Sequence, residues 1–391
     1  MKRCNGQTRT DTDKKRSPCE SDAKKVKRCN GQTRTDTDKK EVRASPMQKK
    51  RKIMKIEIEE RVFHFKQPAG TSRGVYTERR SWFVRMTDGP SVGIGECAPL
   101  PDLSCDASPT YGQTLRQFCD LVEQTGEIPY EAMRDYPSML FGLETAMLSL
   151  RHGDRLFDTA FCRGEVGIPI NGLVWMGNYE EMLQRMEQKL EQGFRCVKLK
   201  IGAINFEQEL DLVKRIRDRF SHHDVELRLD ANGAFAFDEA LYKLELLSQY
   251  AIHSIEQPIK AGQWAFMAQL CRESPLPIAL DEELIGVNDL EMKSHMLNVI
   301  KPAYIVLKPS LHGGMMGCRE WIAAARQHDV GSWITSALES NIGLNAIAGF
   351  CSSVYGDHIT MPQGLGTGQL FTDNIPMPLE IRGDQLWVID D

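Results

Sequence analysis

Residues 196–308 contain short apolar runs that each end in a charged residue: CVKLK (196–200), VELRLD (225–230), IHSIE (252–256), PIALD (277–281) and YIVLK (304–308). The terminal charges lie 25 to 30 residues apart, about the length of one strand and one helix. Near-continuous apolar strands that alternate with helices are typical of a parallel sheet covered by helices. The stretch therefore predicts a (β/α) barrel with charged side chains at the C-terminal ends of its strands, where barrel active sites lie.

The flanking sequence extends this α/β pattern to seven or eight strand–helix units. We expect the first barrel strand at 167–171, the seventh at 332–335 and the eighth at 358–361. Amphipathic segments predict helices at 179–192, 206–220, 238–250, 264–272, 287–297, 314–328 and 341–354. The barrel would occupy residues 166–362.

Residues 54–165 show a different pattern. Short alternating runs at 55–59, 82–86 and 91–97 predict an antiparallel meander. Two helices are expected at 110–124 and 138–151, and small residues in the second would allow close packing. This pattern predicts an α+β domain. Its Gly-rich stretch 68–76 is either a lid over a site or an ordinary hairpin loop, and the segment 363–391 is expected to return to this domain.

The first 53 residues differ from the rest in charge. They carry 18 Lys/Arg and 7 Asp/Glu, a net charge of +11, whereas the remainder carries 31 and 47, a net charge of −16. The segment KRCNGQTRTDTDKK occurs twice without change, at 2–15 and 27–40. So polar a segment cannot form a core, and we exclude it from the folded protein. A nucleic-acid-binding role would rest on this arm alone, and the acidic body opposes it.

The composition also bears on the class of protein and on the compartment in which it works. No run approaches the roughly 18 apolar residues of a membrane helix, and no apolar signal segment opens the chain. The 11 cysteines show no CxxC or zinc-type spacing. Reduced thiols in the cytoplasm are the simplest account of them.

Three of the five terminal charges are carboxylates: Asp230, Glu256 and Asp281. Such hard oxygen ligands suit Mg²⁺ better than zinc, because no thiolate or imidazole stands at a matching position. Mg²⁺ on three carboxylates keeps room for a substrate carboxylate, whose α-carbon would become acidic because the metal stabilises the enediolate. We therefore predict a metal site for Mg²⁺, for which Mn²⁺ could substitute, and a small-molecule carboxylate as the substrate.

Lysines provide candidate bases. Lys198 and Lys200 alternate along one strand and so point to the same face, which in a barrel is the interior. Lys308 would come from the opposite side. A lysine near a dication and a second lysine can act as a base near neutral pH. The alternative is that each charge only marks where a buried strand meets solvent, which would suffice for one strand but not for five in succession.

The ordered set Lys-x-Lys, Asp, Glu, Asp and Lys resembles the enolase superfamily, in its muconate-lactonizing-type subgroup. The resemblance covers residues 54–391 and implies an enolase-type modified TIM barrel closed by an N-terminal capping domain. Further likeness, less specific, lies in LRLDANG (227–233), TSALES (335–340) and GLGTG (364–368). Within the subgroup these stretches are similar to those of synthases that form a succinylated aromatic acid.

The resemblance implies a hydro-lyase of menaquinone biosynthesis that dehydrates 2-succinyl-6-hydroxy-2,4-cyclohexadiene-1-carboxylate to 2-succinylbenzoate. Lys200 would remove the proton α to the ring carboxylate and then assist loss of the 6-hydroxyl as an acid. Lys198 and Lys308 would add positive charge beside the Mg²⁺-held enediolate.

Four residues are weaker candidates for substrate contacts. Arg228 shares the inward face with Asp230, where it either orients ligands or pairs with a neighbouring carboxylate. Asn232 belongs to the LRLDANG stretch. Ser336 either contacts a succinyl carboxylate or caps the following helix, and Gly366 lies in a flexible rim turn.

Two alternatives remain open. An N-acylamino-acid racemase or a dipeptide epimerase of the same superfamily would use the lysines as paired bases. Dipeptide epimerases of the subgroup usually place Asp-x-Asp after the eighth strand, and residues 361–364 (MPQG) have no carboxylate. The second alternative, a binding barrel without catalysis, would be expected to have lost a lysine or a ligand, and none is lost. The oligomeric state is left open.

Overall fold

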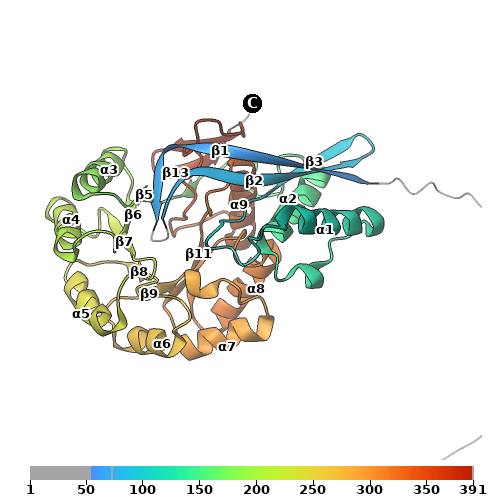
Figure 1. Ribbon diagram of the computed structural model, residues 1–391. Coiled ribbons are helices and arrows are strands. Elements are labelled where there is room, and N and C mark those ends of the chain that lie inside the picture. Colours follow the sequence, from blue (N-terminus) through green and yellow to red (C-terminus); the bar gives the residue numbers. More distant parts are fainter. Residues whose placement is uncertain (1–53, 72–73, 390–391) are drawn as a thin grey trace, which may run out of the picture. The chain divides into compact units, whose positions relative to one another are not determined.

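The computed structural model describes residues 54–71 and 74–389 (Figure 1). The polar extension predicted at residues 1–53 lies outside them. The described residues all fall within one compact unit, Arg51–Asp391. None of the helices among them is both long and apolar enough to cross a membrane.

A parallel sheet forms the centre of the C-terminal part. In the described residues it has seven strands in sequence order: β5 (Gly172–Val174), β6 (Cys196–Lys200), β7 (Glu226–Asp230), β8 (Ser254–Glu256), β9 (Ile278–Leu280), β10 (Tyr304–Leu307) and β11 (Gly331–Ile334). Five of them coincide with the apolar runs of residues 196–308. The sequence prediction of a modified TIM barrel is confirmed.

A helix follows each strand and covers the outer face of the sheet (Figure 1): α3 (Tyr179–Glu191), α4 (Phe206–Arg219), α5 (Phe237–Ser248), α6 (Trp264–Glu273), α7 (Leu290–Ile300), α8 (Gly314–Gln327) and α9 (Asn341–Tyr355). Side chains that accept backbone N–H groups mark several helix starts, as at Asn178, Asn205, Asp289 and Ser340. A short 3-10 helix, Glu282–Leu284, follows β9.

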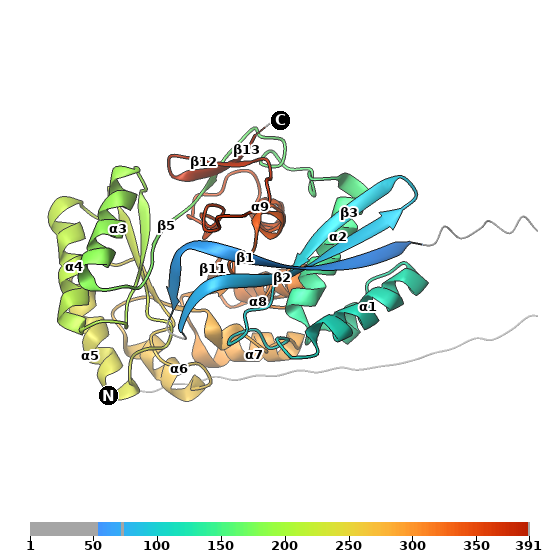
Figure 2. The same ribbon diagram turned by 45° about the horizontal axis from the view of Figure 1, so that its top comes forward.

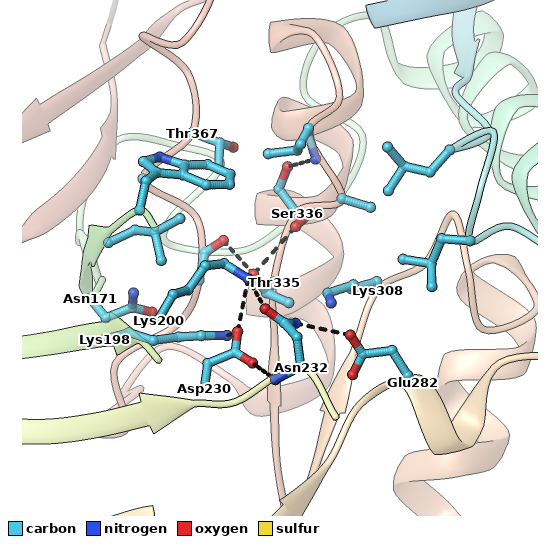
Figure 3. A pocket seen from close by; sticks show the side chains of 18 of the residues that line it. Asn171, Lys198, Lys200, Asp230, Asn232, Glu282, Lys308, Thr335, Ser336 and Thr367 are labelled. Carbon is cyan, nitrogen blue, oxygen red and sulfur yellow. Dashed lines mark hydrogen bonds and ion pairs between the residues drawn. The ribbon is translucent and has the colours of Figure 1, made fainter. Parts of the chain in front are cut away.

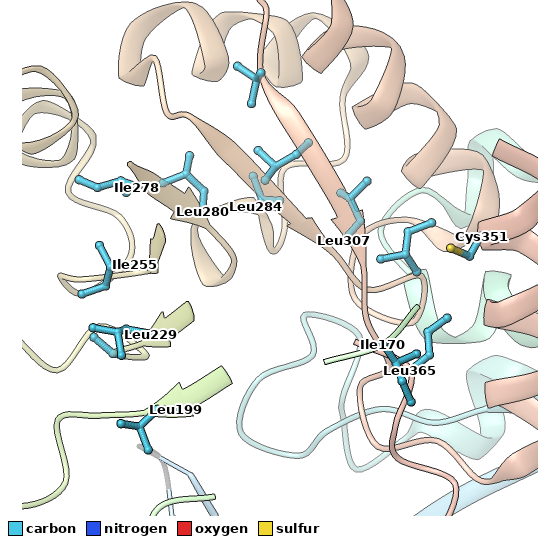
Figure 4. Close-up of a cluster of buried hydrophobic side chains, with 14 of the residues drawn as sticks. Ile170, Leu199, Leu229, Ile255, Ile278, Leu280, Leu284, Leu307, Cys351 and Leu365 are labelled. Carbon is cyan, nitrogen blue, oxygen red and sulfur yellow. The ribbon is translucent and has the colours of Figure 1, made fainter. Parts of the chain in front are cut away.

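Alternation along the strands separates the core from the site. Leu199, Leu229, Ile255 and Leu307 point toward the helices and belong to the largest buried cluster (Figure 4). Burying such a side chain contributes about 1.5–3 kcal/mol. Because successive side chains point to opposite faces of a strand, the charged residues at neighbouring positions point into the barrel.

The closure of the barrel differs from the prediction at both ends. The first barrel strand is β5 rather than residues 167–171, because β4 (Ile168–Pro169) pairs antiparallel with β13 instead. Residues 358–361 form no strand. Closure comes two residues later, where Gln363 and Gly364 make single parallel bridges to Ile170 and Thr335. Single bridges of this kind involve too few residues to produce an apolar run, so a sequence pattern does not reveal them.

The C-terminal segment has two contacts. Its hairpin, β12 (Leu379–Arg382) and β13 (Gln385–Val388), forms a small sheet with β4 (Figure 2). Before the hairpin, Lys66 N–H donates to Leu370 O and Thr372 N–H donates to His64 O. The segment thus touches both the barrel and the first strand of the N-terminal part. The domain boundaries at 165/166 and 362/363 stay a prediction.

The N-terminal part contains the meander β1 (Lys55–Thr71), β2 (Gly74–Asp88) and β3 (Ser91–Cys97), followed by α1 (Tyr111–Thr125), the 3-10 turn Tyr130–Met133 and α2 (Pro137–His152). The predicted close packing occurs where β3 crosses α2, since a Cβ on Gly95 would lie 1.9 Å from Gly142 O. The stretch 68–76 is mostly paired, with Ala69 opposite Tyr76. Its described residues thus belong to the end of a long hairpin, and a role as a lid stays a prediction.

Two buried glutamates of the N-terminal part accept hydrogen bonds from the N-termini of two barrel helices. Glu144 of α2 accepts the N–H groups of Met315 and Met316, at 2.6 and 3.0 Å, in the first turn of α8. Glu96 of β3 accepts the N–H groups of Ser340 and Gly343 at the start of α9. By accepting these N–H groups, each carboxyl group ties the N-terminal part to the barrel.

Glu144 predicts a pH dependence of stability. Burial raises the pKa of Glu144 from 4.5 to about 8, although the two N–H groups oppose this shift. The native state therefore favours the protonated carboxyl, so its contribution to stability is complete at acidic pH and is lost as the pH rises through about 8. We expect the melting temperature of Glu144→Gln, compared with that of the wild type, to improve steadily between pH 5 and pH 9. A difference that stays constant over this range would contradict the prediction.

Candidate active site

A cavity opens at the C-terminal ends of the barrel strands (Figure 3). Its volume is about 930 Å³, including the open mouth. The polar part of its lining contains Lys198, Lys200, Asp230, Asn232, Glu282 and Lys308. Trp175 and Trp333 of the barrel, with Leu100 and Leu103 of the N-terminal part, supply apolar surface. The cavity thus combines a charged floor with apolar walls that suit a flat ring.

Lys198 and Lys200 both enter the cavity from β6, as their alternation predicts (Figure 3). Lys198 Nζ lies 2.9 Å from Asp230 Oδ2 and 2.6 Å from Glu256 Oε2. Burial alone would lower the pKa of Lys198, but the three neighbouring carboxylates raise it above its usual value. Lys198 therefore remains an ammonium and serves better as a fixed positive charge than as a base.

Lys200 has a less crowded setting. Its Nζ lies 3.1 Å from Asp230 Oδ2 and donates to Asn232 Oδ1 at 2.6 Å. The ammonium also lies 5.9 Å from the centroid of the Trp175 ring. These contacts hold the nitrogen at the boundary between the charged floor and the apolar wall of the cavity.

Lys308 faces these two lysines from the other side of the cavity (Figure 3). It directly follows β10, which three strands separate from β6 in the sheet, and it forms an ion pair with Asp281. Burial would lower the pKa of Lys308, but the carboxylates of Asp281, Glu256 and Glu282 raise it above its usual value. Two sides of the cavity thus carry a lysine.

The three predicted metal ligands end adjacent strands. Asp230 is paired in register with Glu256, and Asp281 directly follows β9. All three are almost fully buried, at 0 to 2% exposed. Burial and the charge of Asp230 raise the pKa of Glu256 well above its usual value, whereas the lysines lower that of Asp230 against the effect of burial. The charged form of Glu256 is therefore disfavoured by burial and by Asp230, whereas the charged form of Asp230 is favoured by the lysines.

The residues fit a hard divalent cation by their chemistry. Glu256 Oε1, Asp281 Oδ1 and the neighbouring Glu282 Oε2 are buried and have no hydrogen-bond donor. Such orphaned carboxylate oxygens are suited to Mg²⁺. Within residues 54–71 and 74–389, however, no three acidic, His or Cys side chains form a ready-made metal cluster, since the Lys198 ammonium lies between Asp230 and Glu256. The donor set fits, and its assignment as a metal site stays a prediction.

The predicted substrate contacts divide into two groups. Ser336, Asn232 and Gly366 line the cavity, but the first two also hold other residues: Ser336 Oγ donates to Glu339 Oε2, and Asn232 binds both Lys200 and Glu282. Arg228 does not line the cavity.

Arg228 lies deeper in the barrel. Its guanidinium donates to Glu226 Oε1 and Pro362 O and packs 4.5 Å from the Trp333 ring centroid. The structure thus shows the pairing with a carboxylate, Glu226, that the sequence offered as one of two roles. A contact of Arg228 with a substrate stays a prediction, and its position two residues before Asp230 places it one layer below the cavity floor.

Several residues that line the cavity could not be assigned to it, or were not, from the sequence alone. Asn171 and Glu282 carried a usable signal, since each is a polar residue at or next to the end of a predicted strand. Thr335 and Thr367 belong to the stretches TSALES (335–340) and GLGTG (364–368), whose pattern assigns no role to either threonine. The contribution of Leu100 and other residues from the N-terminal part had no sequence signal, because it depends on how that part packs on the barrel.

Arg79 explains how this packing is held beside the cavity. Its guanidinium is 2% exposed and donates to the carbonyls of Ala98, Pro99, Ala337 and Leu338. The first two precede the lining residue Leu100, and the last two line the cavity themselves. One side chain thus joins the two segments that form this wall.

Comparisons with known proteins agree with this geometry. Residues 181–390 match the model "Enolase C-terminal domain-like", and residues 70–150 match "MenC, N-terminal domain". The o-succinylbenzoate synthase of Desulfotalea psychrophila is 46% identical over 359 residues, which cover 83% of this chain and 96% of that protein.

Solved structures show the same likeness. The crystal structure of MenC from Desulfotalea psychrophila has a TM-score of 0.73 at 41% identity and covers 86% of this chain and 99% of that one. A dipeptide epimerase from Enterococcus faecalis, described as complexed with Mg and the dipeptide L-Leu-L-Tyr, has a TM-score of 0.71 at 18% identity, covering 86% and 96%, and shows the shared fold. The chain therefore belongs to the enolase superfamily and, within it, to the family of o-succinylbenzoate synthases.

Proposed function

We propose that this protein is a hydro-lyase that dehydrates 2-succinyl-6-hydroxy-2,4-cyclohexadiene-1-carboxylate to 2-succinylbenzoate in menaquinone biosynthesis. The relative at 46% identity, which this chain covers over 96% of its length, carries the proposal. The cavity supports it, because lysines, carboxylates and an apolar wall occur together where the barrel strands end.

Lys200 acts as the base and then as the acid. Asp230 and Asn232 fix its nitrogen within 3.1 Å of their oxygens, so its position does not depend on the substrate. It takes the proton from the carbon next to the ring carboxylate, and the ring gains a double bond as the C6–OH bond breaks. The same lysine returns the proton to the departing hydroxide, which leaves as water. Because the product ring is aromatic, the elimination is intrinsically favourable.

The other charged residues stabilise the negative charge that forms on the substrate carboxylate. Lys198 and Lys308 are ammonium groups held by carboxylates on two sides of the floor, and fixed charges in a water-poor site stabilise developing charge strongly. A divalent cation on Asp230, Glu256 and Asp281 would supply further positive charge at this carboxylate. We assign the site to Mg²⁺, with Mn²⁺ as a substitute, on the basis of its all-oxygen donor set.

The apolar wall holds the ring. Trp175, Trp333 and Leu338 line one side of the cavity, and contact with them keeps water away from the reacting carbon. We further propose a cytoplasmic enzyme acting on a small carboxylate, which agrees with the eight described cysteines all being free thiols.

The proposal is tested by an assay of the purified protein with the cyclohexadiene substrate and Mg²⁺, run beside N-succinyl amino acids. We expect dehydration to be the faster reaction by a wide margin. The absence of dehydration with a folded, Mg²⁺-supplied protein would refute the proposed function.

A racemase is the second candidate, because Lys200 and Lys308 face the cavity from different sides and racemisation needs a base on each face. Exchange of the α-proton in D₂O with an N-succinyl amino acid separates the two. A synthase should exchange it slowly, with one enantiomer and through Lys200. Rapid exchange of both enantiomers, each dependent on a different lysine and rivalling the dehydration, would assign the protein as a racemase instead.

A further inference from the structure

A second cavity adjoins the active-site cavity. It measures about 1530 Å³, including its mouth, and lies between Phe65–Ala69 of β1, helix α3 and the residues after Gly366. The end of the β1–β2 hairpin extends toward β5 in this region (Figures 1 and 2). Five residues line both cavities and form a shared wall: Asn171, Leu173, Trp175, Gly366 and Thr367.

The charges of the second cavity have one sign. Among the described residues that line it, the charged ones are Lys66, Arg185 and Lys189, with no Asp or Glu. This is notable because residues 54–391 carry a net charge of −16. A carboxylate approaching such an acidic body is repelled in general, whereas a local group of cations attracts it and raises its rate of association.

The two lysines have no carboxylate partner. Lys189 Nζ donates to Gln192 Oε1 at 3.2 Å and lies 5.1 Å from the Phe194 ring centroid, and burial lowers its pKa. Lys66 is exposed. Neither ammonium has an ion pair with any residue in the described ranges, so their charge is available to a ligand. Arg185 differs, since it donates to Trp175 O and Met176 O and thereby holds the shared wall.

The shared wall carries polar groups that also lack partners. Thr367 is 7% exposed, and its Oγ1 is buried without a hydrogen bond. Asn171 is 6% exposed, and its side-chain amide has no hydrogen bond to another described residue. Figure 3 shows Asn171 beside Lys198 and Lys200, whereas Thr367 lies farther from them along the same wall. Buried polar atoms are normally satisfied, so the Thr367 hydroxyl points to a polar ligand that reaches the wall, and the Asn171 amide lines the same wall.

We propose that the second cavity is an anion-binding vestibule for the dicarboxylate substrate and product. Lys66 and Lys189 attract a carboxylate of the dianion, and Asn171 and Thr367 give it hydrogen bonds at the wall next to the active site. The vestibule rests on the proposed function, because that function supplies a ligand with two carboxylates. The vestibule offsets the repulsion by the acidic body and takes no part in the proton transfers.

The test is a double variant, Lys66→Gln/Lys189→Gln, compared with Lys55→Gln/Lys214→Gln. The control pair is exposed, lines neither cavity and removes the same charge. We expect kcat/KM of the vestibule variant to fall about tenfold with kcat unchanged, and its dependence on ionic strength to become weaker. The control should match the wild type in all three quantities.

A binding measurement makes the test independent of turnover. By calorimetry, the affinity for 2-succinylbenzoate should fall about tenfold in the vestibule variant, and the affinity for the monoanion benzoate should fall less. If the vestibule variant behaves as the control pair does in both measurements, the vestibule is refuted. A wild-type protein that binds the dianion through these lysines but does not dehydrate would refute the proposed function and leave the vestibule supported. Lys66→Gln alone, at an exposed position, should show part of the same loss if the double variant does not fold.

Discussion

Replacing Lys200 with alanine should lower the rate of dehydration by at least about 10²–10⁴-fold, the contribution of a general acid–base group. Both proton transfers are assigned to this nitrogen, so its loss removes the base of the first step and the acid of the second. The measurement is kcat under saturating substrate and Mg²⁺, together with the melting temperature. The fold should remain, since the side chain makes its contacts at the cavity surface.

Two other lysine variants show whether the loss of activity is specific to Lys200. Lys214→Ala removes an exposed lysine of α4 and should leave kcat unchanged. Lys308→Ala should also reduce kcat, because a fixed charge beside Asp281 is lost. It should nevertheless keep the α-proton exchange that depends on Lys200. Turnover of Lys200→Ala close to that of the wild type would show that another group is the base.

Removal of divalent cations, or Asp230→Asn, should abolish turnover while the barrel stays folded. Buried Asp230, Glu256 and Asp281 lie together on the floor, and Glu256 and Asp281 each keep an oxygen without a donor. Without a cation, only the lysines offset their mutual repulsion, so the protein in chelator should also melt at a lower temperature than in Mg²⁺. Activity and melting are both measured across a Mg²⁺ titration.

The control for the metal prediction uses a carboxylate outside the site. Glu245→Gln on α5 changes charge equally but should alter neither the activity nor the rise in melting temperature with Mg²⁺. Full activity in excess chelator would refute the metal assignment. A rise in melting temperature with Mg²⁺ that persists in Asp230→Asn would place the cation elsewhere.

The positions of the catalytic candidates could be read from the sequence because two simple rules determine them. Alternation along β6 requires Lys198 and Lys200 to share the inward face, and parallel strands bring Asp230, Glu256 and Asp281 to one edge of the sheet. The helices could also be predicted from local pattern, since amphipathic segments of sufficient length separate the strands. The local sequence pattern was therefore enough to predict the position of a residue that depends only on its own strand.

What the sequence did not show depends on contacts between distant segments. Gln363 closes the barrel through a single bridge to Ile170, which leaves no periodic pattern. Leu100 lines the cavity from a segment that Arg79 joins to Ala337, and such a contact between distant segments has no local pattern. Arg228 was placed correctly on the inward face, but its depth depends on Trp333 and Pro362. Such positions require knowledge of the tertiary packing.

The way in which the barrel closes has a consequence for synthesis on the ribosome. The ring is completed by Gln363 and Gly364, and Gly366 and Thr367 of the cavity follow directly. Until these residues emerge, the nascent chain can form at most an open parallel sheet with unpaired edges at β5 and β11. Exposed edges invite aggregation. The barrel is therefore most vulnerable just before residues 363–367 emerge from the ribosome, and its cavity is complete only once they have emerged.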